Sequence, residues 1–304
     1  MPEPCGSLAL PPDFDELREL RARHPELIAA HAAARRRRPL LGADGKLMIV
    51  AADHPARGAL GVRAAAGAMA NRYDLLSRLL VALGRPGVDG LLASADIIED
   101  LMVLGALDDK VVIGSMNRGG LQGASFELDD RFTGYDTATI GAMGLDGGKM
   151  LARIDLADPG TVATLEAAGR AVTELATRRK VAMVEPFIVS RPDGGRVVND
   201  LSPKAVAKSV AIASALGATS AYTWLKLPVV DGMEEVMTAT TLPTLLLGGD
   251  PGDLADDAYG RWAAALALPG VRGFVIGRAL LYPADGDVAA AVDAACALVH
   301  GGRS

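Results

Sequence analysis

The sequence contains few of the residues that mark several common classes of protein. Among its 304 residues are 2 cysteines, 4 histidines and only 4% aromatic side chains. Cys5 and Cys296 lie near opposite ends of the chain and no CxxC motif is present, which excludes a disulfide framework and predicts a reducing, cytoplasmic location. His24, His31 and His300 lie in terminal segments. A zinc centre usually takes three ligands rich in His or Cys, so we expect no metal and no other cofactor.

Charge and hydropathy exclude two kinds of partner. The net charge of −6 gives no basic footprint for nucleic acid, and the basic run at 35–38 is typical of a helix C-terminus. No apolar stretch is long enough and free enough of polar residues to span a membrane. The expected partner is a small molecule, and the apolar helices are compatible with a homo-oligomer.

Eight short apolar runs alternate with longer segments of helical period, a pattern typical of parallel strands buried on both faces. Eight such units favour a closed (β/α)8 barrel over an open sheet, and no GxGxxG motif follows the first run. We therefore predict a single TIM barrel over 41–304, preceded over 1–40 by a helical extension that Pro25 interrupts. The predicted strands are Lys46–Asp53, Val88–Ala95, Lys110–Asn117, Lys149–Asp155, Val181–Ile188, Thr219–Leu227, Pro243–Gly249 and Val271–Gly277.

The segments between the strands predict eight helices and one long loop. The loop is Arg118–Gly134, and the extension is expected to be helical over Pro12–Arg38. The predicted barrel helices are Ala66–Leu83, Asp96–Leu104, Tyr135–Gly144, Pro159–Arg179, Pro203–Leu216, Gly232–Ala239, Asp253–Leu266 and Asp287–His300.

Polar residues close several of the predicted strands, where the chemistry of a barrel is placed. Asp53, Asn117, Asp155 and Lys226 occupy such positions. Lys226 lies inside an apolar strand, where a charged amine is costly to bury, in a chain with 7 lysines against 24 arginines. A lysine, unlike an arginine, can lose its proton and attack a carbonyl to form a Schiff base. The alternative is a lysine that reaches the barrel rim or pairs with a carboxylate.

Two further charges interrupt apolar strands. Lys149, Arg153 and Asp155 alternate along one strand and therefore share a face, and a cation beside Lys226 would favour its neutral amine. Lys149 could instead lie at the bottom of the barrel, far from any site. Glu185 is expected to act in proton transfer with a pKa raised by burial. It could also form a permanent salt bridge with an interior lysine, which is compatible with that role.

Residues suited to binding follow the other strands. Asp53 could hold a substrate hydroxyl, steady a lysine or order its own loop. Gly248 and Gly249 after the seventh predicted strand, with Gly277 and Arg278 after the eighth, are suited to phosphate, because barrels often bind it with the N–H groups of these two loops.

Taken in order, these residues resemble the class I aldolase group that includes tagatose-bisphosphate, archaeal-type fructose-bisphosphate and, more distantly, deoxyribose-phosphate aldolases. The resemblance covers about residues 46–280. The chain also resembles an actinobacterial branch of this group that is linked to inositol breakdown. It implies that Lys226 is the Schiff-base lysine and Glu185 the general acid or base, with Asp53 and Lys149 as polar supports. It also implies a phosphorylated keto sugar or sugar acid as substrate, cleaved to dihydroxyacetone phosphate and an aldehyde. Arg153 and Asn117, from their places on the predicted strands, are further binding candidates.

Two alternatives stay open at this point. One is a magnesium-assisted lyase or isomerase using Asp53, Asp155 and Glu185, with Lys226 as a charge partner. The other is a catalytically silent barrel that binds a sugar phosphate, since a fold does not establish a function.

Overall fold

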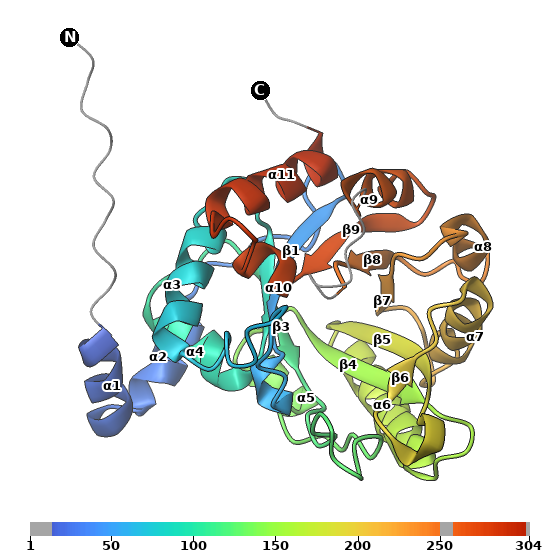
Figure 1. The fold of residues 1–304 in the computed structure, drawn as a ribbon. Coiled ribbons are helices and arrows are strands. Elements are labelled where there is room, and N and C mark those ends of the chain that lie inside the picture. The colour runs from blue at the N-terminus through green and yellow to red at the C-terminus, as the bar shows by residue number, and fades with distance from the viewer. Residues whose placement is uncertain (1–13, 250–257, 302–304) are drawn as a thin grey trace.

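A computed structural model describes residues 14–249 and 258–301. Eight parallel strands form a closed barrel in the order β4-β3-β2-β1-β9-β8-β7-β5, and β5 pairs with β4 to complete the ring. Figure 1 looks into this barrel, with the helices arranged around the outside. The predicted (β/α)8 fold is confirmed.

All eight predicted strands are present, because each run of apolar residues is buried on both faces between the barrel interior and the helices. They are β1 Leu47–Ala52, β2 Gly90–Ala93, β3 Val111–Ser115, β4 Gly147–Ile154, β5 Val181–Ser190, β7 Thr223–Pro228, β8 Thr244–Leu247 and β9 Val271–Ile276.

Four of the barrel helices begin where a side chain caps them. Asn71, Asp136, Ser202 and Asp287 each accept hydrogen bonds from backbone N–H groups in the first turn of a helix. The helices are α3 Arg72–Leu83, α4 Ala95–Val103, α5 Thr137–Ala142, α6 Gly160–Thr177, α7 Pro203–Ser214, α8 Met233–Met237, α9 Ala258–Leu266, α10 Arg278–Leu281 and α11 Val288–His300.

Four short elements were not predicted, and several predicted helices are shorter, among them Ala66–Leu83. Residues 66–70 form turns, because the Asn71 cap sets the start of α3. The unpredicted elements are the 3-10 turns η1 Pro55–Arg57 and η2 Pro192–Gly194, the helix α10, and the strand β6 Val198–Asn199, which pairs antiparallel with the end of β5. The first residues of the predicted Asp253–Leu266 and Pro12–Arg38 helices lie outside the described residues.

The N-terminal segment forms two helices, α1 Phe14–Arg23 and α2 Glu26–Ala34, interrupted at Pro25 as predicted. Arg21 joins α1 to Asp100 of α4 at 2.7 Å. Arg35 follows at the C-cap of α2 and also binds the barrel. Arg35 is buried and donates to the carbonyls of Lys110 and Gly144, each at 2.8 Å.

Within the described part of the chain, no helix has the length and apolar character needed to cross a bilayer.

Candidate active site

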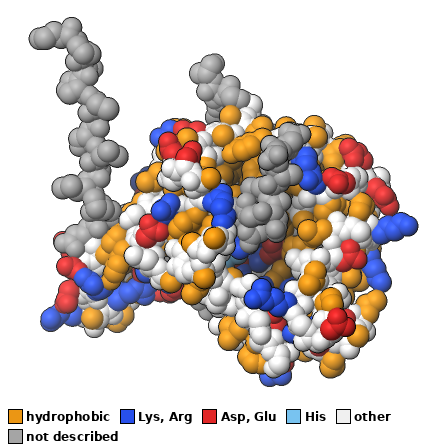
Figure 2. All heavy atoms as spheres, viewed as in Figure 1, with side chains coloured by type: hydrophobic (Ala, Val, Ile, Leu, Met, Phe, Trp, Pro, Cys, Tyr) orange, Lys and Arg blue, Asp and Glu red, His pale blue; other side chains and the backbone are white. Residues whose placement is uncertain are grey.

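The barrel opens at the C-terminal ends of its strands into a cavity of about 480 Å³. In Figure 2 this opening is a hollow near the middle of the face, with Lys and Arg side chains around it. Asp53, Lys149, Glu185 and Lys226, the four predicted catalytic residues, all line the cavity. The barrel thus brings together residues that are up to 173 positions apart, from 53 to 226, in one site.

The floor of the cavity is a chain of five charges of alternating sign. Lys226 Nζ lies 2.8 Å from Glu185 Oε1, and the other oxygen of Glu185 pairs with Lys149. Lys149 Nζ also lies 3.3 Å from Asp53 Oδ2, which pairs in turn with Arg118. Each of these side chains is at least nine-tenths buried. The two lysines therefore share one carboxylate.

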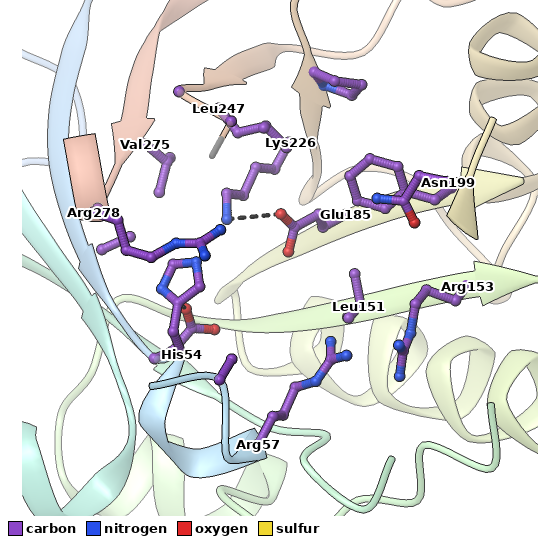
Figure 3. Close-up of a pocket in the computed structure, with 18 of the residues that line it drawn as sticks. His54, Arg57, Leu151, Arg153, Glu185, Asn199, Lys226, Leu247, Val275 and Arg278 are labelled. Carbon is purple, nitrogen blue, oxygen red and sulfur yellow. Dashed lines mark ion pairs between the residues drawn. The ribbon is translucent and has the colours of Figure 1, made fainter. Parts of the chain in front are cut away.

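Strand register produces this arrangement. Leu151 on β4 is opposite Glu185 on β5, and Val184 on β5 is opposite Leu225 on β7. Residues of one strand alternate between the two faces, so the neighbours on the inner face are Lys149, Glu185 and Lys226. In Figure 3, Lys226 extends across the cavity toward Glu185. Lys149 therefore reaches the site instead of lying at the bottom of the barrel.

The ionisation of Glu185 differs from the sequence expectation. Burial alone raises its pKa, as expected, but the ammonium groups of Lys149 and Lys226 outweigh burial and hold the pKa far below its ordinary range. The expectation of a raised pKa was wrong, because the sequence did not show that two cations meet at one carboxylate. The permanent salt bridge weighed as an alternative is what the structure contains.

Burial affects the pKa of both Lys149 and Arg118 in the same direction. Burial lowers the pKa of Lys149 well below its ordinary value, although Glu185 opposes this shift. Burial also lowers the pKa of Arg118 to about 10, so that it remains a cation at neutral pH. With all groups charged, the floor carries three cations and two anions, and loss of one lysine proton makes it neutral.

A second charged group forms one wall above the floor. Arg153 donates to Glu127 Oε1 at 2.6 Å, and Arg57 lies 3.6 Å from the same oxygen. Asp130 lies 3.7 Å from Arg153. Arg57 and Arg153 both point into the cavity in Figure 3. Glu127 and Asp130 come from the predicted Arg118–Gly134 loop, which therefore contributes to the site.

The glycine loops lie on the opposite side of the cavity. Gly248, Gly249, Gly277 and Arg278 all line it, at the ends of β8 and β9. Gly277 is needed as glycine, because a Cβ there would collide with the carbonyl oxygen of Ala51. The end of β9 can therefore sit directly against β1.

Two residues singled out from the sequence do not line the cavity. The Asn117 side chain is fully buried and bonds the backbone of Leu151 twice, donating to its carbonyl at 2.6 Å and accepting from its N–H at 2.8 Å. Asp155 accepts from the N–H of Ala157 in its own loop. Both side chains order backbone at the mouth, so neither contributes to the cavity wall.

Sequence reasoning missed Arg118, Ser115 and Glu127 and gave no role to His54. Arg118 directly follows the predicted strand Lys110–Asn117, and a charge at a strand end is the signal that could have found it. Glu127 lies in an irregular loop, where no periodicity indicates the direction of a side chain.

Among the described residues, no group of three or more His, Cys, Asp or Glu side chains is placed to hold a metal ion. Asp53 and Glu185, which the magnesium alternative requires, each contact a cationic side chain.

The fold and the site define a (β/α)8 barrel with a lysine-carboxylate cluster in the floor of its mouth. The chain belongs to the Cgl0159-like family, whose pattern matches residues 45–296. It is similar over 96% of its length, with 58% identity and a TM-score of 0.93, to the crystal structure of Cgl0159 from Corynebacterium glutamicum, of which 98% is covered. A search of curated proteins gave no match.

More distant solved structures share the fold. A Schiff base-forming fructose-1,6-bisphosphate aldolase is 20% identical, with a TM-score of 0.60 over 90% of this chain and 99% of the other. An archaeal fructose 1,6-bisphosphate aldolase is 18% identical, with a TM-score of 0.62 over 90% of this chain and 100% of the other. The predicted likeness to the barrel of class I aldolases is confirmed at the level of fold.

Proposed function

We propose that the protein is a class I aldolase that cleaves a phosphorylated keto sugar or keto sugar acid through a Schiff base on Lys226. The observation that carries this proposal is the contact of 2.8 Å between Lys226 Nζ and Glu185, in the floor of a cavity where a second lysine shares the same carboxylate. Lys226 is the better nucleophile because it has one carboxylate partner, whereas Lys149 lies between two.

The attack on a ketone requires Lys226 as a neutral amine. Lys149, whose pKa burial lowers, can receive the proton of Lys226 by way of the Glu185 carboxylate between them. Lys226 Nζ then adds to the carbonyl carbon, and loss of water gives the iminium. The floor keeps its total charge throughout the transfer, so no new charge is buried.

The iminium accepts the electrons of the breaking carbon-carbon bond. The hydroxyl on the far side of that bond loses its proton and becomes the carbonyl of the aldehyde product, while the ketone half stays on Lys226 as an enamine. Protonation of the enamine and hydrolysis release the ketone, for which we propose dihydroxyacetone phosphate. Glu185, expected from the sequence to take the hydroxyl proton, is a weak base because two ammonium groups stabilise its ionised form.

The cavity has two cationic regions suited to an anionic substrate. Gly248, Gly249, Gly277 and Arg278 would hold the phosphate on one side. Arg153, with Arg57, would bind the distal end of the substrate on the other. The substrates named for the distant aldolases support a sugar phosphate. The inositol-breakdown branch, the cytoplasmic location and a homo-oligomer stay predictions.

The two alternative functions have less support. The magnesium reaction needs Asp155, whose carboxylate caps its own loop, together with Asp53 and Glu185, which pair with cations. A silent binding barrel would keep two costly buried lysines with no chemical use for them.

The decisive experiment is borohydride trapping. The wild type and Lys226→Met are incubated with dihydroxyacetone phosphate and sodium borohydride, and the products are analysed by intact mass and peptide mapping. We expect one stable adduct on Lys226 of the wild type and none on the variant. Lys204→Met, an exchange on helix α7 outside the cavity, is the matched control and should form the adduct normally.

Each other outcome has a definite meaning. An adduct on Lys149 would retain the reaction class but exchange the roles of the two lysines. If neither dihydroxyacetone phosphate nor a panel of ketose phosphates gives an adduct, the Schiff-base function is rejected.

A further inference from the structure

His54 is the one histidine in the cavity wall, and the steps above give it no role. It follows Asp53 at the end of β1 and precedes the turn η1. Its ring lies against Gly277, where an added Cβ would come within 3.2 Å of His54 Cε1. In Figure 3 the imidazole is directed into the same part of the cavity as the end of Lys226, beneath Arg278. The ring therefore borders the place where the substrate carbonyl would react.

The neighbouring Asp53 is arranged to serve this histidine. Ser115 Oγ at 3.2 Å, Lys149 Nζ at 3.3 Å and the Arg118 guanidinium all contact the same oxygen, Oδ2. The other oxygen, Oδ1, lies 3.8 Å from His54 Nδ1. Nδ1 is buried and has no hydrogen-bond partner among the described residues. A shift of about 1 Å would bring this pair to hydrogen-bond distance.

Once this pair closes to hydrogen-bond distance, it sets the tautomer and direction of the ring. A proton on Nδ1 would point toward Asp53 Oδ1, leaving Nε2 as the acceptor for the cavity. An aspartate placed behind a histidine in this way orients the imidazole and stabilises the imidazolium once it forms. Asp53 itself cannot turn toward the substrate without losing its three partners on Oδ2.

The charges around the ring keep it neutral before reaction. Burial lowers the pKa of His54 well below its ordinary value, and the cations Arg278, Lys226 and Lys149 act in the same direction, while Glu185 opposes them. The lone pair on Nε2 is therefore available at neutral pH, whereas Glu185 is a weak base.

We propose that His54, oriented by Asp53, is the general acid and base of the carbon-carbon cleavage. This inference rests on the proposed Schiff-base function. His54 Nε2 takes the proton of the substrate hydroxyl, and the O–H pair becomes the second bond of the new carbonyl. The pair of the broken carbon-carbon bond forms the C=C bond of the enamine, and the second pair of the C=N bond moves to the iminium nitrogen. The imidazolium then returns the same proton to the enamine carbon, which restores the iminium for hydrolysis. No other reactant is needed besides water.

The test uses the half-reaction of the ketone, which needs no knowledge of the aldehyde. In deuterium oxide, the wild type with dihydroxyacetone phosphate should exchange a hydrogen on the carbon beside the iminium. His54 removes it as a proton, that proton is replaced by solvent deuterium on the imidazolium, and a deuteron is returned to the enamine carbon. His54→Gln should slow this exchange by ~10²–10⁴-fold, while the borohydride adduct on Lys226 forms to the same extent. His24→Gln, at an exposed position between α1 and α2, is the matched control and should behave as wild type.

A role in structure alone is separated from a role in proton transfer by two further readouts. In the wild type the exchange rate should fall as pH decreases and His54 becomes protonated, and His54→Gln should lose this dependence. In His54→Ala, added imidazole should restore part of the exchange, because it can occupy the vacated space as a base. A variant that fails to fold would not form the adduct, and the adduct assay therefore reports folding as well.

The outcomes separate the two proposals. Unchanged exchange in His54→Gln, with the adduct present, overturns the role of His54 and leaves the Schiff base intact. An equal loss of adduct and exchange also overturns it, since His54 would then support the site rather than move protons. Absence of the adduct in the wild type rejects the proposed function itself.

Discussion

The two ends of the barrel both enclose lysines, half-buried at the N-terminal ends of the strands and buried at the mouth, and they give them different partners. At the N-terminal ends of the strands, Lys46, Lys110 and Lys180 donate to backbone carbonyls of Val271, Val88 and Leu145 at 2.8, 2.6 and 2.5 Å. At the mouth, Lys149 and Lys226 pair with Glu185. Burial lowers the pKa at the bottom for all three lysines and at the mouth for Lys149.

The partner decides what a buried lysine can do. A backbone carbonyl accepts a hydrogen bond but takes up no proton at ordinary pH. Lys46, Lys110 and Lys180 therefore stabilise the backbone at the N-terminal ends of the strands and have no partner for proton transfer in these contacts. A carboxylate can accept and pass on a proton, and at the mouth it also borders a cavity. The same residue type therefore stabilises one end of the barrel and is placed for chemistry at the other.

The largest effect should come from Lys149→Met at the mouth. Loss of the residue that receives the Lys226 proton should lower kcat by ~10²–10⁴-fold. Borohydride should still trap the substrate on Lys226, but more slowly, which rapid-quench sampling would detect. Wild-type kcat in this variant would contradict the proton path through Glu185.

The same variant should be at least as stable as the wild type. Because the folded protein holds the Lys149 pKa below its unfolded value, its stability at neutral pH is reduced by the unfavourable burial of charge. The reduction disappears as pH rises toward about 10.4, the unfolded value. Urea unfolding should show a gain of about 1 kcal/mol for Lys149→Met at pH 7, shrinking toward pH 10. A gain that grew with pH would contradict the lowered pKa.

Glu185→Gln should be destabilising, since two ammonium groups lose their shared counter-charge. We expect a loss of about 3–5 kcal/mol at pH 7. The folded pKa of Glu185 lies below its unfolded value, so its stabilisation is present above about pH 4.3 and is lost as pH falls through the folded pKa. The difference between variant and wild type should therefore narrow below pH 4. Glu166→Gln, on the exposed face of α6, should show neither effect in the same unfolding series.

The smallest effect should come from the bottom of the barrel. Lys180→Met removes one half-buried hydrogen bond to the Leu145 carbonyl and should cost about 1 kcal/mol of stability. Trapping and turnover should stay within about twofold of wild type, because nothing at the mouth contacts this residue. A large fall in turnover without unfolding would show that the two ends are coupled.

Local pattern was sufficient for the strands and for finding Lys226 and Glu185. An apolar strand that contains a charge signals a buried site regardless of its partner, because burial of an unpaired charge is costly. The pattern failed at Asn117, which occupies a strand end like Asp53 but bonds the backbone of Leu151. It also gave no indication of β6, since a two-residue pairing has no period of its own.

The sequence by itself determined that eight apolar strands alternate with helices, that the chain closes as a barrel, and that several charges lie at the strand ends. Only the tertiary structure decided which charges meet. The register of β4, β5 and β7 placed two lysines on one carboxylate and reversed the expected direction of the Glu185 pKa. The approach of β9 to β1 set the His54 ring against Gly277. Burial follows from the pattern of single residues, whereas electrostatic partners depend on contacts between strands far apart in sequence.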